Sequence, residues 1–246
     1  MPNKPPDLLD EGVRARRDAL LIVNRWMRNN AFPDRQMARV QGEHGFVMDL
    51  VYGVVRGHRR LEWTLAPLLS RRPPTLWIAA LLTGAQQLLF MRDVADHAAL
   101  HATVEALKLI APGGTGLVNG VLRNLLRRRE ALLRELERQP LALRTSHPEL
   151  LVERWTRHFG ADETAALCHW NNQPAETVAI LLPGRGVSPG DLLARWAQEG
   201  LQAHPHRACP QALVLPRAVN PARIAGFDEG LFVVQDPATL AAVELL

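Results

Sequence analysis

Arginines in the first half of the chain are the residues whose type and spacing most clearly suggest chemistry. Of the 29 basic residues only Lys4 and Lys108 are lysines, and the planar guanidinium of arginine binds phosphate through paired hydrogen bonds. Three groups of arginines fall on predicted helices and are candidates for contacts with an RNA backbone. These are Arg14, Arg16 and Arg17 at the start of the first predicted helix, Arg56, Arg59 and Arg60 at a helix junction, and Arg123 on the last helix of this half.

The first two groups are the better candidates. Cations in the first turn of a helix oppose the helix dipole, at a cost of a few tenths of a kcal/mol each, and a bound phosphate would offset that cost. On the last helix, acidic residues border the arginines, and Glu130 and Arg134 are spaced for an ordinary i,i+4 ion pair. We therefore slightly favour a salt-bridged surface there. Its arginines are Arg123, Arg127, Arg134 and Arg138.

Two groups of histidines could in principle bind a metal. His97 and His101 lie one helical turn apart, but no glutamate follows His97 as in zinc proteases, and no third ligand is evident. His204, His206 and Cys209 are closely spaced and lack a fourth ligand. The sequence therefore predicts no metal site.

A glycine-rich run, 111–116, precedes a predicted helix, where backbone N–H groups can cradle a phosphate or a cofactor carboxylate. Such a loop needs a strand before it, and 104–110 has a helical pattern instead. We interpret the run as a helix–helix turn. No nucleophile elbow or Walker loop occurs, and Cys168 is predicted to pack in a helix, so no set of residues forms a catalytic constellation.

Apolar residues at helical spacing predict an all-α domain over residues 1–142. Its helices are expected within 15–30, 46–55, 61–69, 76–91, 96–111 and 117–139, with Asp96 as an N-cap and 76–91 buried at the centre. Residues 143–246 are predicted to form a small α+β domain. It has capping boxes at 146–149 and 188–191 and candidate strands at 176–182, 212–215 and 231–234.

Composition agrees with a mainly α protein of one large or two small domains. The chain has 246 residues, of which 47% are hydrophobic and 22% charged, which excludes a disordered or disulfide-framed chain. Residues 1–140 carry a net charge of +7 and residues 141–246 a net charge of −3, so a polyanionic partner would bind the first half. With no signal peptide and no apolar run of membrane-spanning length, we expect a cytoplasmic protein without a membrane partner.

Several short motifs, in order, resemble the helical domain of the NusB type. They cover about residues 13–135, and the resemblance implies an RNA-binding fold. The motifs are 52–56 (Tyr-Gly-Val-Val-Arg), 84–89 with Gln87, His97-Ala98, Val104-Glu105, and 118–123 with Asn119. The chain departs from the pattern at Gln86, where tyrosine is usual, and at His101, where asparagine is common.

The second half is similar to the segment that follows this domain in the RsmB/Sun family of ribosomal RNA cytosine-5 methyltransferases. The matching residues are His147-Pro148, Asn171-Asn172 and 230–237, which includes Gln235 and Asp236. The resemblance implies small-subunit ribosomal RNA as partner and S-adenosylmethionine as the cofactor of a downstream catalytic domain. Gln235 and Asp236 then either border an active site or simply start a helix, since Asp-Pro is a common helix beginning.

The catalytic parts of that family are missing from the chain. The Pro-Gly-Gly-Lys cofactor loop and both cysteine motifs are absent, and Cys209-Pro210 has the reversed order. Without a thiolate to add to cytosine C6, we expect no catalysis by this chain and no cofactor in it. It is either a shortened product of a longer enzyme or a stand-alone remnant that positions RNA. The alternatives are a NusB-type antitermination factor and a non-catalytic interaction module; the oligomeric state is not predicted.

Overall fold

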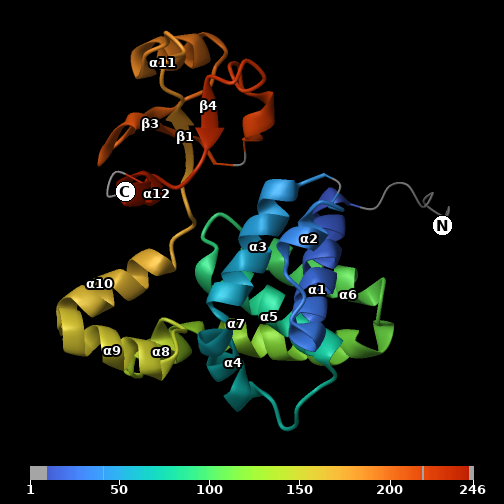
Figure 1. Cartoon of the computed structure of the whole chain (residues 1–246). Helices are drawn as coiled ribbons and strands as arrows, with labels where there is room; N and C mark the ends of the chain where they lie inside the picture. Colours follow the sequence, from blue (N-terminus) through green and yellow to red (C-terminus); the bar gives the residue numbers. More distant parts are fainter. Residues whose placement is uncertain (1–9, 41, 218, 244–246) are drawn as a thin grey trace, which may run out of the picture. The chain divides into compact units, whose positions relative to one another are not determined.

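The computed structural model describes residues 10–40, 42–217 and 219–243, without the side chains of 241–243. The chain forms two compact units, Met1–Gln173 and Pro174–Leu246, and each is described by itself (Figure 1). The domain boundary predicted between residues 142 and 143 falls within the first unit, after the bundle helices. The predicted fold class, a helical bundle followed by a small α+β domain, is confirmed.

The first unit is helical throughout its described residues. Its α-helices are α1 Glu11–Asn29, α2 Asp34–Met37, α3 His44–Arg56, α4 His58–Leu65, α5 Thr75–Phe90, α6 Asp96–Lys108, α7 Thr115–Glu137, α8 Leu141–Arg144, α9 Glu149–Phe159 and α10 Ala161–Asn171. Short 3-10 turns, Ala66–Leu68 and Pro112–Gly114, join α4 to α5 and α6 to α7.

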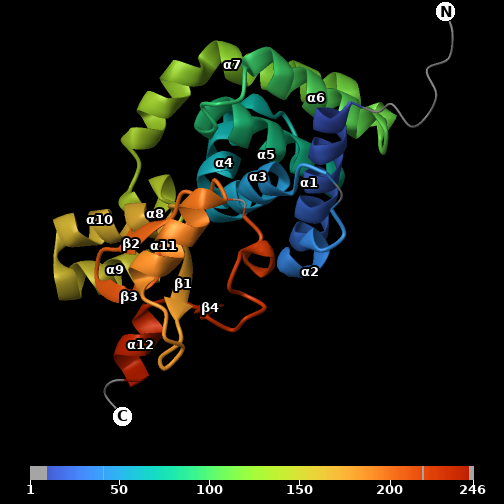
Figure 2. The ribbon, with the colours of Figure 1, turned by 90° about the horizontal axis from the view of Figure 1, so that it is seen from above.

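Helix α5 is the centre of the bundle, as predicted. Its residues from Ile78 to Leu88 are all buried, because the helix carries no charged residue and is contacted by α1, α3, α4, α6 and α7. Figures 1 and 2 show these five helices around it. Burial on all sides makes α5 the frame to which the outer helices are fixed.

Two glycines of the NusB-like motifs allow helices to approach closely. A Cβ added at Gly53 would lie 2.5 Å from the Gln86 amide, and one added at Gly84 would lie 2.5 Å from a Leu122 methyl. Real Cβ atoms do not come this close to a neighbour, so a side chain at either position would force the Gln86 amide or the Leu122 side chain to move from its place between the helices. The sequence motifs at 52–56 and 84–89 therefore have a packing explanation.

Helices α8, α9 and α10 extend the first unit beyond the bundle. Helix α8 packs against α4 and α9, and α9 packs against α10. The capping box predicted at 146–149 is wrong, because α9 begins at Glu149 after Pro148 without a side-chain cap. The Ser146 hydroxyl instead accepts a hydrogen bond from the backbone N–H of Arg60, at 3.0 Å. Asp96 is likewise the first residue of α6 and not its N-cap.

The second unit is a four-stranded antiparallel sheet with helices. Its elements are β1 Thr177–Leu181, α11 Pro189–Gln198, β2 His204–His206, β3 Cys209–Leu215, the 3-10 turn Pro221–Arg223, β4 Phe232–Val234 and α12 Ala238–Val243. The strand order is β2-β3-β1-β4, with Ala179 opposite Leu213 on one side and Val234 on the other. Strand β2 was not predicted, since His-Pro-His has no strand pattern.

One face of this sheet is covered by α11. The ring of Trp196 is fully buried and meets Phe232 of β4 edge to face at 5.4 Å, while its Nε1 donates to the Ala225 carbonyl at 2.9 Å. The predicted capping box at Ser188 and Asp191 is present at the start of α11. The apolar spacing of α11 and the alternation of β1 and β3 therefore build a separate core.

Candidate nucleic-acid interface

Helix α1 carries its three predicted arginines on two different sides. At 100° per residue, Arg14 and Arg17 lie about 60° apart, whereas Arg16 lies about 160° from Arg14. The structure follows this division. Arg14 and Arg17 line one hollow of the surface, while Arg16 is buried and lines another.

We call the first hollow the arginine groove. It lies between α1 and the segment around α2, has a volume of about 170 Å³, and brings together four arginines and one carboxylate. Its lining residues are Arg14, Arg17, Asp18, Leu21, Ile22, Arg25, Gln36, Arg39 and Val40. A concave surface with this excess of guanidinium groups attracts a phosphate backbone.

Hydrogen bonds hold several of the groove's side chains in place. Arg17 binds the Asp18 carboxylate through Nε and Nη2, at 3.0 and 2.8 Å. Arg25 donates from Nη1 to the Gln36 Oε1 at 3.2 Å and so joins α1 to α2. Because one carboxylate stands among four guanidinium groups, the groove keeps a net positive charge.

Helix α2 is fixed to the bundle on its other side. The Tyr52 hydroxyl of α3 donates a hydrogen bond to the Asp34 carboxylate, and burial together with this bond raises the pKa of Tyr52 to about 12. The Asp34 carboxylate is thus bound to Tyr52 and does not line the groove. Met37 is buried in the bundle core. These contacts give the groove a wall fixed to α3.

Arg16 has a structural role that its sequence position did not reveal. It is 8% exposed, and it donates from Nε to Gln87 Oε1 at 2.9 Å and from Nη1 to the Gly12 carbonyl at 3.0 Å. Its guanidinium lies 4.4 Å from the ring centre of Phe46. Burial lowers the pKa of Arg16, partly compensated by Glu43 and Asp10. These contacts favour a scaffold role and leave the phosphate contacts predicted for this group to Arg14 and Arg17.

The family-motif residue Gln87 forms the other half of this contact. Its Nε2 donates to the Thr83 carbonyl at 3.0 Å and to the Thr103 hydroxyl at 3.1 Å, while its oxygen accepts from Arg16. One buried amide therefore connects α1, α5 and α6. The family-motif residue Gln87 is thus a buried residue that joins three helices by hydrogen bonds, and this structural role was not evident from the sequence.

Arg16 also lines a larger hollow of about 950 Å³ between α1, α6 and α7. Arg123 and Asn119 lie on its α7 side, joined by a hydrogen bond of 3.0 Å from Arg123 Nε to Asn119 Oδ1. His97 and His101 line its α6 side. Among the residues that the structure describes, no three or more His, Cys, Asp or Glu side chains are placed to hold a metal.

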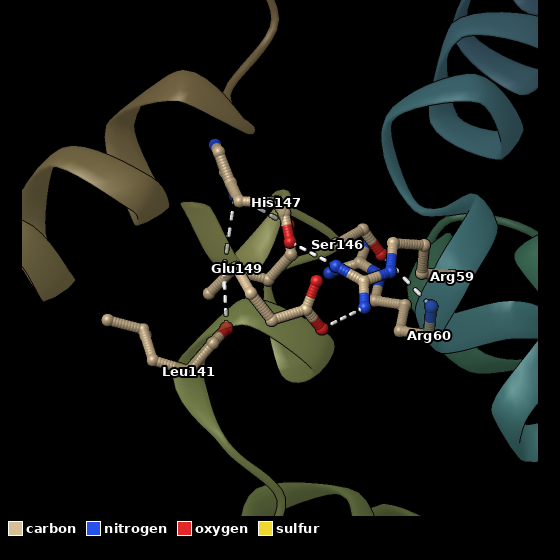
Figure 3. A network of polar contacts seen from close by, with 7 residues as sticks. Arg59, Arg60, Leu141, Ser146, His147 and Glu149 are labelled. Atoms are coloured by element: carbon tan, nitrogen blue, oxygen red, sulfur yellow. Dashed lines mark hydrogen bonds and ion pairs between the residues drawn. The ribbon is translucent and has the colours of Figure 1, made fainter. Parts of the chain in front are cut away.

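Arg59 and Arg60 hold α8 and α9 on α4, as Figure 3 shows. Arg59 donates to the His147 carbonyl and to the Glu149 carboxylate, and this bond lowers the pKa of Glu149. The guanidinium of Arg60 lies 4.0 Å from the ring centre of Phe90, and burial lowers its pKa. These contacts favour a structural role, while Arg56 lies half-buried in the last turn of α3.

Two of the three motifs of the second resemblance meet at this junction. His147 Nδ1 lies 2.9 Å from the Thr145 carbonyl, and its Nε2 lies 3.5 Å from Asn171 Nδ2. Asn172 donates to the same Thr145 carbonyl at 2.8 Å. His147-Pro148 and Asn171-Asn172 are 24 residues apart in sequence, yet they close one hydrogen-bonded loop around α9 and α10.

Gln235 and Asp236 lie at the start of α12 in the second unit. Asp236 Oδ1 accepts from the Ala238 N–H at 2.8 Å, and Gln235 Nε2 donates to the Thr239 hydroxyl at 2.6 Å. Of the two interpretations left open by the sequence, these contacts support the start of a helix. A role at the edge of an active site stays a prediction.

The glycine-rich run forms the predicted helix–helix turn. Pro112–Gly114 is a 3-10 turn between α6 and α7, and Gly114 gives room to the Trp77 ring, which would lie 2.6 Å from an added Cβ. Because a helix precedes the turn, these residues do not fit S-adenosylmethionine as the loop after a strand would. No helix among the described residues is long and apolar enough to cross a membrane.

Of the nine residues that line the arginine groove, only Arg14 and Arg17 were predicted; the polar residues that were missed include Arg25, Gln36 and Arg39. Arg25 lies about 20° from Arg14 on the helical wheel, so helical periodicity could have identified it. Gln36 and Arg39 reach the groove only through the turn that folds α2 back on α1, which no local pattern in the sequence indicates.

Two family models match the chain, in the order that the sequence motifs suggested. Residues 13–127 match the NusB family, and residues 147–221 match the family described as "Methyltr_RsmF/B-like, ferredoxin-like domain". The second match begins at residue 147, between α8 and α9, and so includes α9 and α10 of the first compact unit. The strand order β2-β3-β1-β4 agrees with the ferredoxin-like description.

Curated relatives named ribosomal RNA small subunit methyltransferase B match almost the whole chain. The Pseudomonas putida protein is 32% identical over 94% of this chain and 53% of its own length. The Pseudomonas syringae pv. tomato protein is 34% identical over 89% and 49%. The chain thus spans about half the length of these relatives. The crystal structure of PH0851 has the same fold, with a TM-score of 0.65, 16% identity, and coverage of 99% of this chain and 56% of that one.

Proposed function

We propose that this chain, which is similar to the N-terminal half of the relatives named ribosomal RNA small subunit methyltransferase B, binds and positions small-subunit ribosomal RNA. The observation that carries the proposal is the arginine groove, where four guanidinium groups converge on one concave surface of the NusB-like bundle. The RNA target also implies a cytoplasmic location.

Phosphate contacts account for this binding better than base contacts. The groove presents guanidinium groups over an aliphatic floor that includes Leu21, Ile22 and Val40. Such a surface neutralises phosphates and displaces their counterions, which gives affinity without reading sequence. The groove would therefore hold and orient the RNA, and recognition of a target nucleotide would lie elsewhere.

We assign no methyl-transfer step to the described residues. S-adenosylmethionine would supply a methyl group, but the 111–116 turn does not fit that cofactor, and the thiol of Cys168 is buried with its pKa raised by that burial. In the proposal the cofactor belongs to a catalytic domain outside this sequence. In this proposal residues 1–142 bind RNA and residues 143–246 form the part that precedes catalysis, of which α9 and α10 belong to the first compact unit and the α+β fold to the second.

A lone NusB-type antitermination factor is less well supported. The match to the RsmF/B-like ferredoxin-like family over residues 147–221 and the hydrogen-bonded loop of His147, Asn171 and Asn172 have no place in a protein made only of a NusB bundle. We therefore favour the methyltransferase-related role over that alternative.

The test is RNA binding by charge-matched double variants. Fluorescence anisotropy with a fragment of small-subunit ribosomal RNA should give a Kd about tenfold weaker for Arg17→Gln with Arg39→Gln than for the unaltered chain. The matched control is Arg154→Gln with Arg157→Gln on α9, where both side chains are exposed; this pair should change the Kd little. If both double variants lost the same RNA affinity, the RNA site would not be localised in the arginine groove. If the unaltered chain did not bind RNA, the proposed function would be refuted.

A variant that removes a negative charge from the groove should strengthen RNA binding and so tests the same site. Asp18→Asn removes the carboxylate that binds Arg17 and should tighten RNA binding several-fold at low salt, because the repulsion of phosphate is removed. Asp162→Asn, an exposed carboxylate on α10, serves as the control. An equal effect of the two changes would mean that only net charge matters.

A further inference from the structure

Phe32 is an exposed aromatic residue on an ordered loop. Its side chain is 68% exposed, between α1 and α2. The loop is pinned at one end by Asn30, whose backbone adopts a left-handed conformation and whose N–H donates to the Trp26 carbonyl at 2.9 Å. At the other end Pro33 is buried and accepts from the N–H of Gln36 at 2.9 Å. The fold thus holds a phenylalanine in solvent although burial of such a ring is favourable.

Arginines surround Phe32 in the chain. Two of them, Arg25 and Arg39, line the arginine groove, and the only acidic residue between them, Asp34, is bound to Tyr52. Gln36 of the groove is four residues from Phe32, so the Cα atoms of these two residues lie within about 14 Å of each other. The four exposed arginines of this segment are Arg25, Arg28, Arg35 and Arg39.

We infer that Phe32 stacks on an unpaired base of an RNA whose phosphates lie in the arginine groove; this inference rests on the proposed function. Aromatic side chains beside a cationic groove are the usual arrangement for binding unpaired nucleotides, since every base has a face on which a ring stacks. In a regular duplex the base faces are covered by their neighbours. The ligand is therefore RNA with a loop, bulge or single-stranded end.

A protein partner is less consistent with the surroundings of the ring. The core of a protein interface is an apolar patch depleted of charge, whereas Phe32 is the only exposed large apolar side chain described between residues 25 and 39. An exposed ring flanked in sequence by four exposed arginines matches the alternation of base and phosphate in a nucleotide chain.

The experiment compares two RNAs and three variants of the full chain. The RNAs are a hairpin with 2-aminopurine in its loop and a fully paired duplex of equal length. Phe32→Ala should weaken hairpin binding about tenfold and abolish the quenching of 2-aminopurine on binding, while duplex binding and the salt dependence stay unchanged. Phe32→Trp should restore hairpin binding. Leu150→Ala, another exposed apolar side chain on α9, is the control and should change neither RNA.

The outcomes separate the two proposals. An unchanged hairpin Kd in Phe32→Ala, with weaker binding in the Arg17 and Arg39 double variant, overturns the stacking role and leaves the proposed function standing. Equal losses of hairpin and duplex binding in Phe32→Ala also overturn it. If the unaltered chain binds neither RNA, both proposals fail. Because Phe32 is exposed, a matching thermal unfolding curve is expected for Phe32→Ala and excludes misfolding as the cause of a loss.

Discussion

Gln86 and Gln87 are neighbours on α5, but their side-chain amides differ in hydrogen bonding. Both are buried. Gln87 satisfies Arg16, Thr83 and Thr103 through one amide, whereas Gln86 presses its amide against Gly53 and leaves its Oε1 without a hydrogen-bond partner. A buried polar atom without a partner costs free energy, and a bonded one does not.

Substitution by methionine should therefore have opposite effects at the two positions. Gln86→Met removes an unsatisfied oxygen at nearly constant volume and should raise the free energy of unfolding by about 1 kcal/mol. Gln87→Met leaves the Nε of Arg16 without its hydrogen-bond partner and should lower the free energy of unfolding by about 2 kcal/mol. Urea denaturation of the two variants measures both changes. A loss of stability in Gln86→Met as large as that in Gln87→Met would contradict this assignment.

Arginines show the limit of sequence reasoning at this scale. The sequence identified Arg14, Arg16, Arg17, Arg56, Arg59, Arg60 and Arg123 by their charge and by their places on predicted helices. Arg16 and Arg60 instead lie over the rings of Phe46 and Phe90, and Arg59 binds the segment around His147. Charge does not reveal which guanidinium groups bind other parts of the same protein, because the residues that they contact lie far away in the sequence.

At the scale of elements, helical periodicity predicted the helices better than charge predicted the roles of the arginines. The buried α5, the long α7 and the capping box of α11 follow from local patterns. The missed elements lack such patterns: α2 is four residues long, and β2 is the tripeptide His-Pro-His, held in place by pairing with β3. Tertiary contacts, which local sequence does not contain, decide these short segments.

The junction of α4 with α8 and α9 makes an element-scale prediction about pH. Because Arg59 lowers the pKa of Glu149 in the folded chain, the pair stabilises the fold above the unfolded pKa of about 4.3 and loses that contribution as the pH falls through the lower folded value. Glu149→Gln should reduce the melting temperature at pH 7, and this difference from the unaltered chain should shrink below about pH 4.

A neighbouring glutamate provides the control for this measurement. Glu153 lies on the same helix and is exposed, so Glu153→Gln should change the melting temperature less than Glu149→Gln at pH 7. A difference for Glu149→Gln that stays constant from pH 7 to pH 3 would show that the ion pair with Arg59 does not contribute to stability.

At the scale of the whole molecule, each unit has its own core. The buried cluster around α5 draws on the bundle alone, and the cluster around Trp196 draws on the second unit alone. The predicted boundary between residues 142 and 143 follows interruptions of the helical pattern near residues 139–147. Helices α9 and α10 lie beyond it and belong to the first compact unit, with contacts to Arg59 and Arg60 that the local pattern does not contain.

Fragments of the chain test this organisation. A fragment ending at Gln173 keeps the arginine groove and the contacts of Arg59, and should unfold cooperatively and bind RNA within about twofold of the full chain. A fragment ending at Ala142 loses those contacts and should unfold at a lower temperature while binding RNA equally well. If either fragment folds but loses RNA binding, the groove is not the main RNA site.

The most direct test of the central claim is the salt dependence of RNA binding, measured for the unaltered chain and for a variant with Arg14, Arg17, Arg25 and Arg39 all changed to glutamine. If these guanidinium groups contact phosphates, the plot of log K against log salt concentration should become shallower by about 3 in the variant. An unchanged slope would contradict the account and place the phosphate contacts outside the arginine groove.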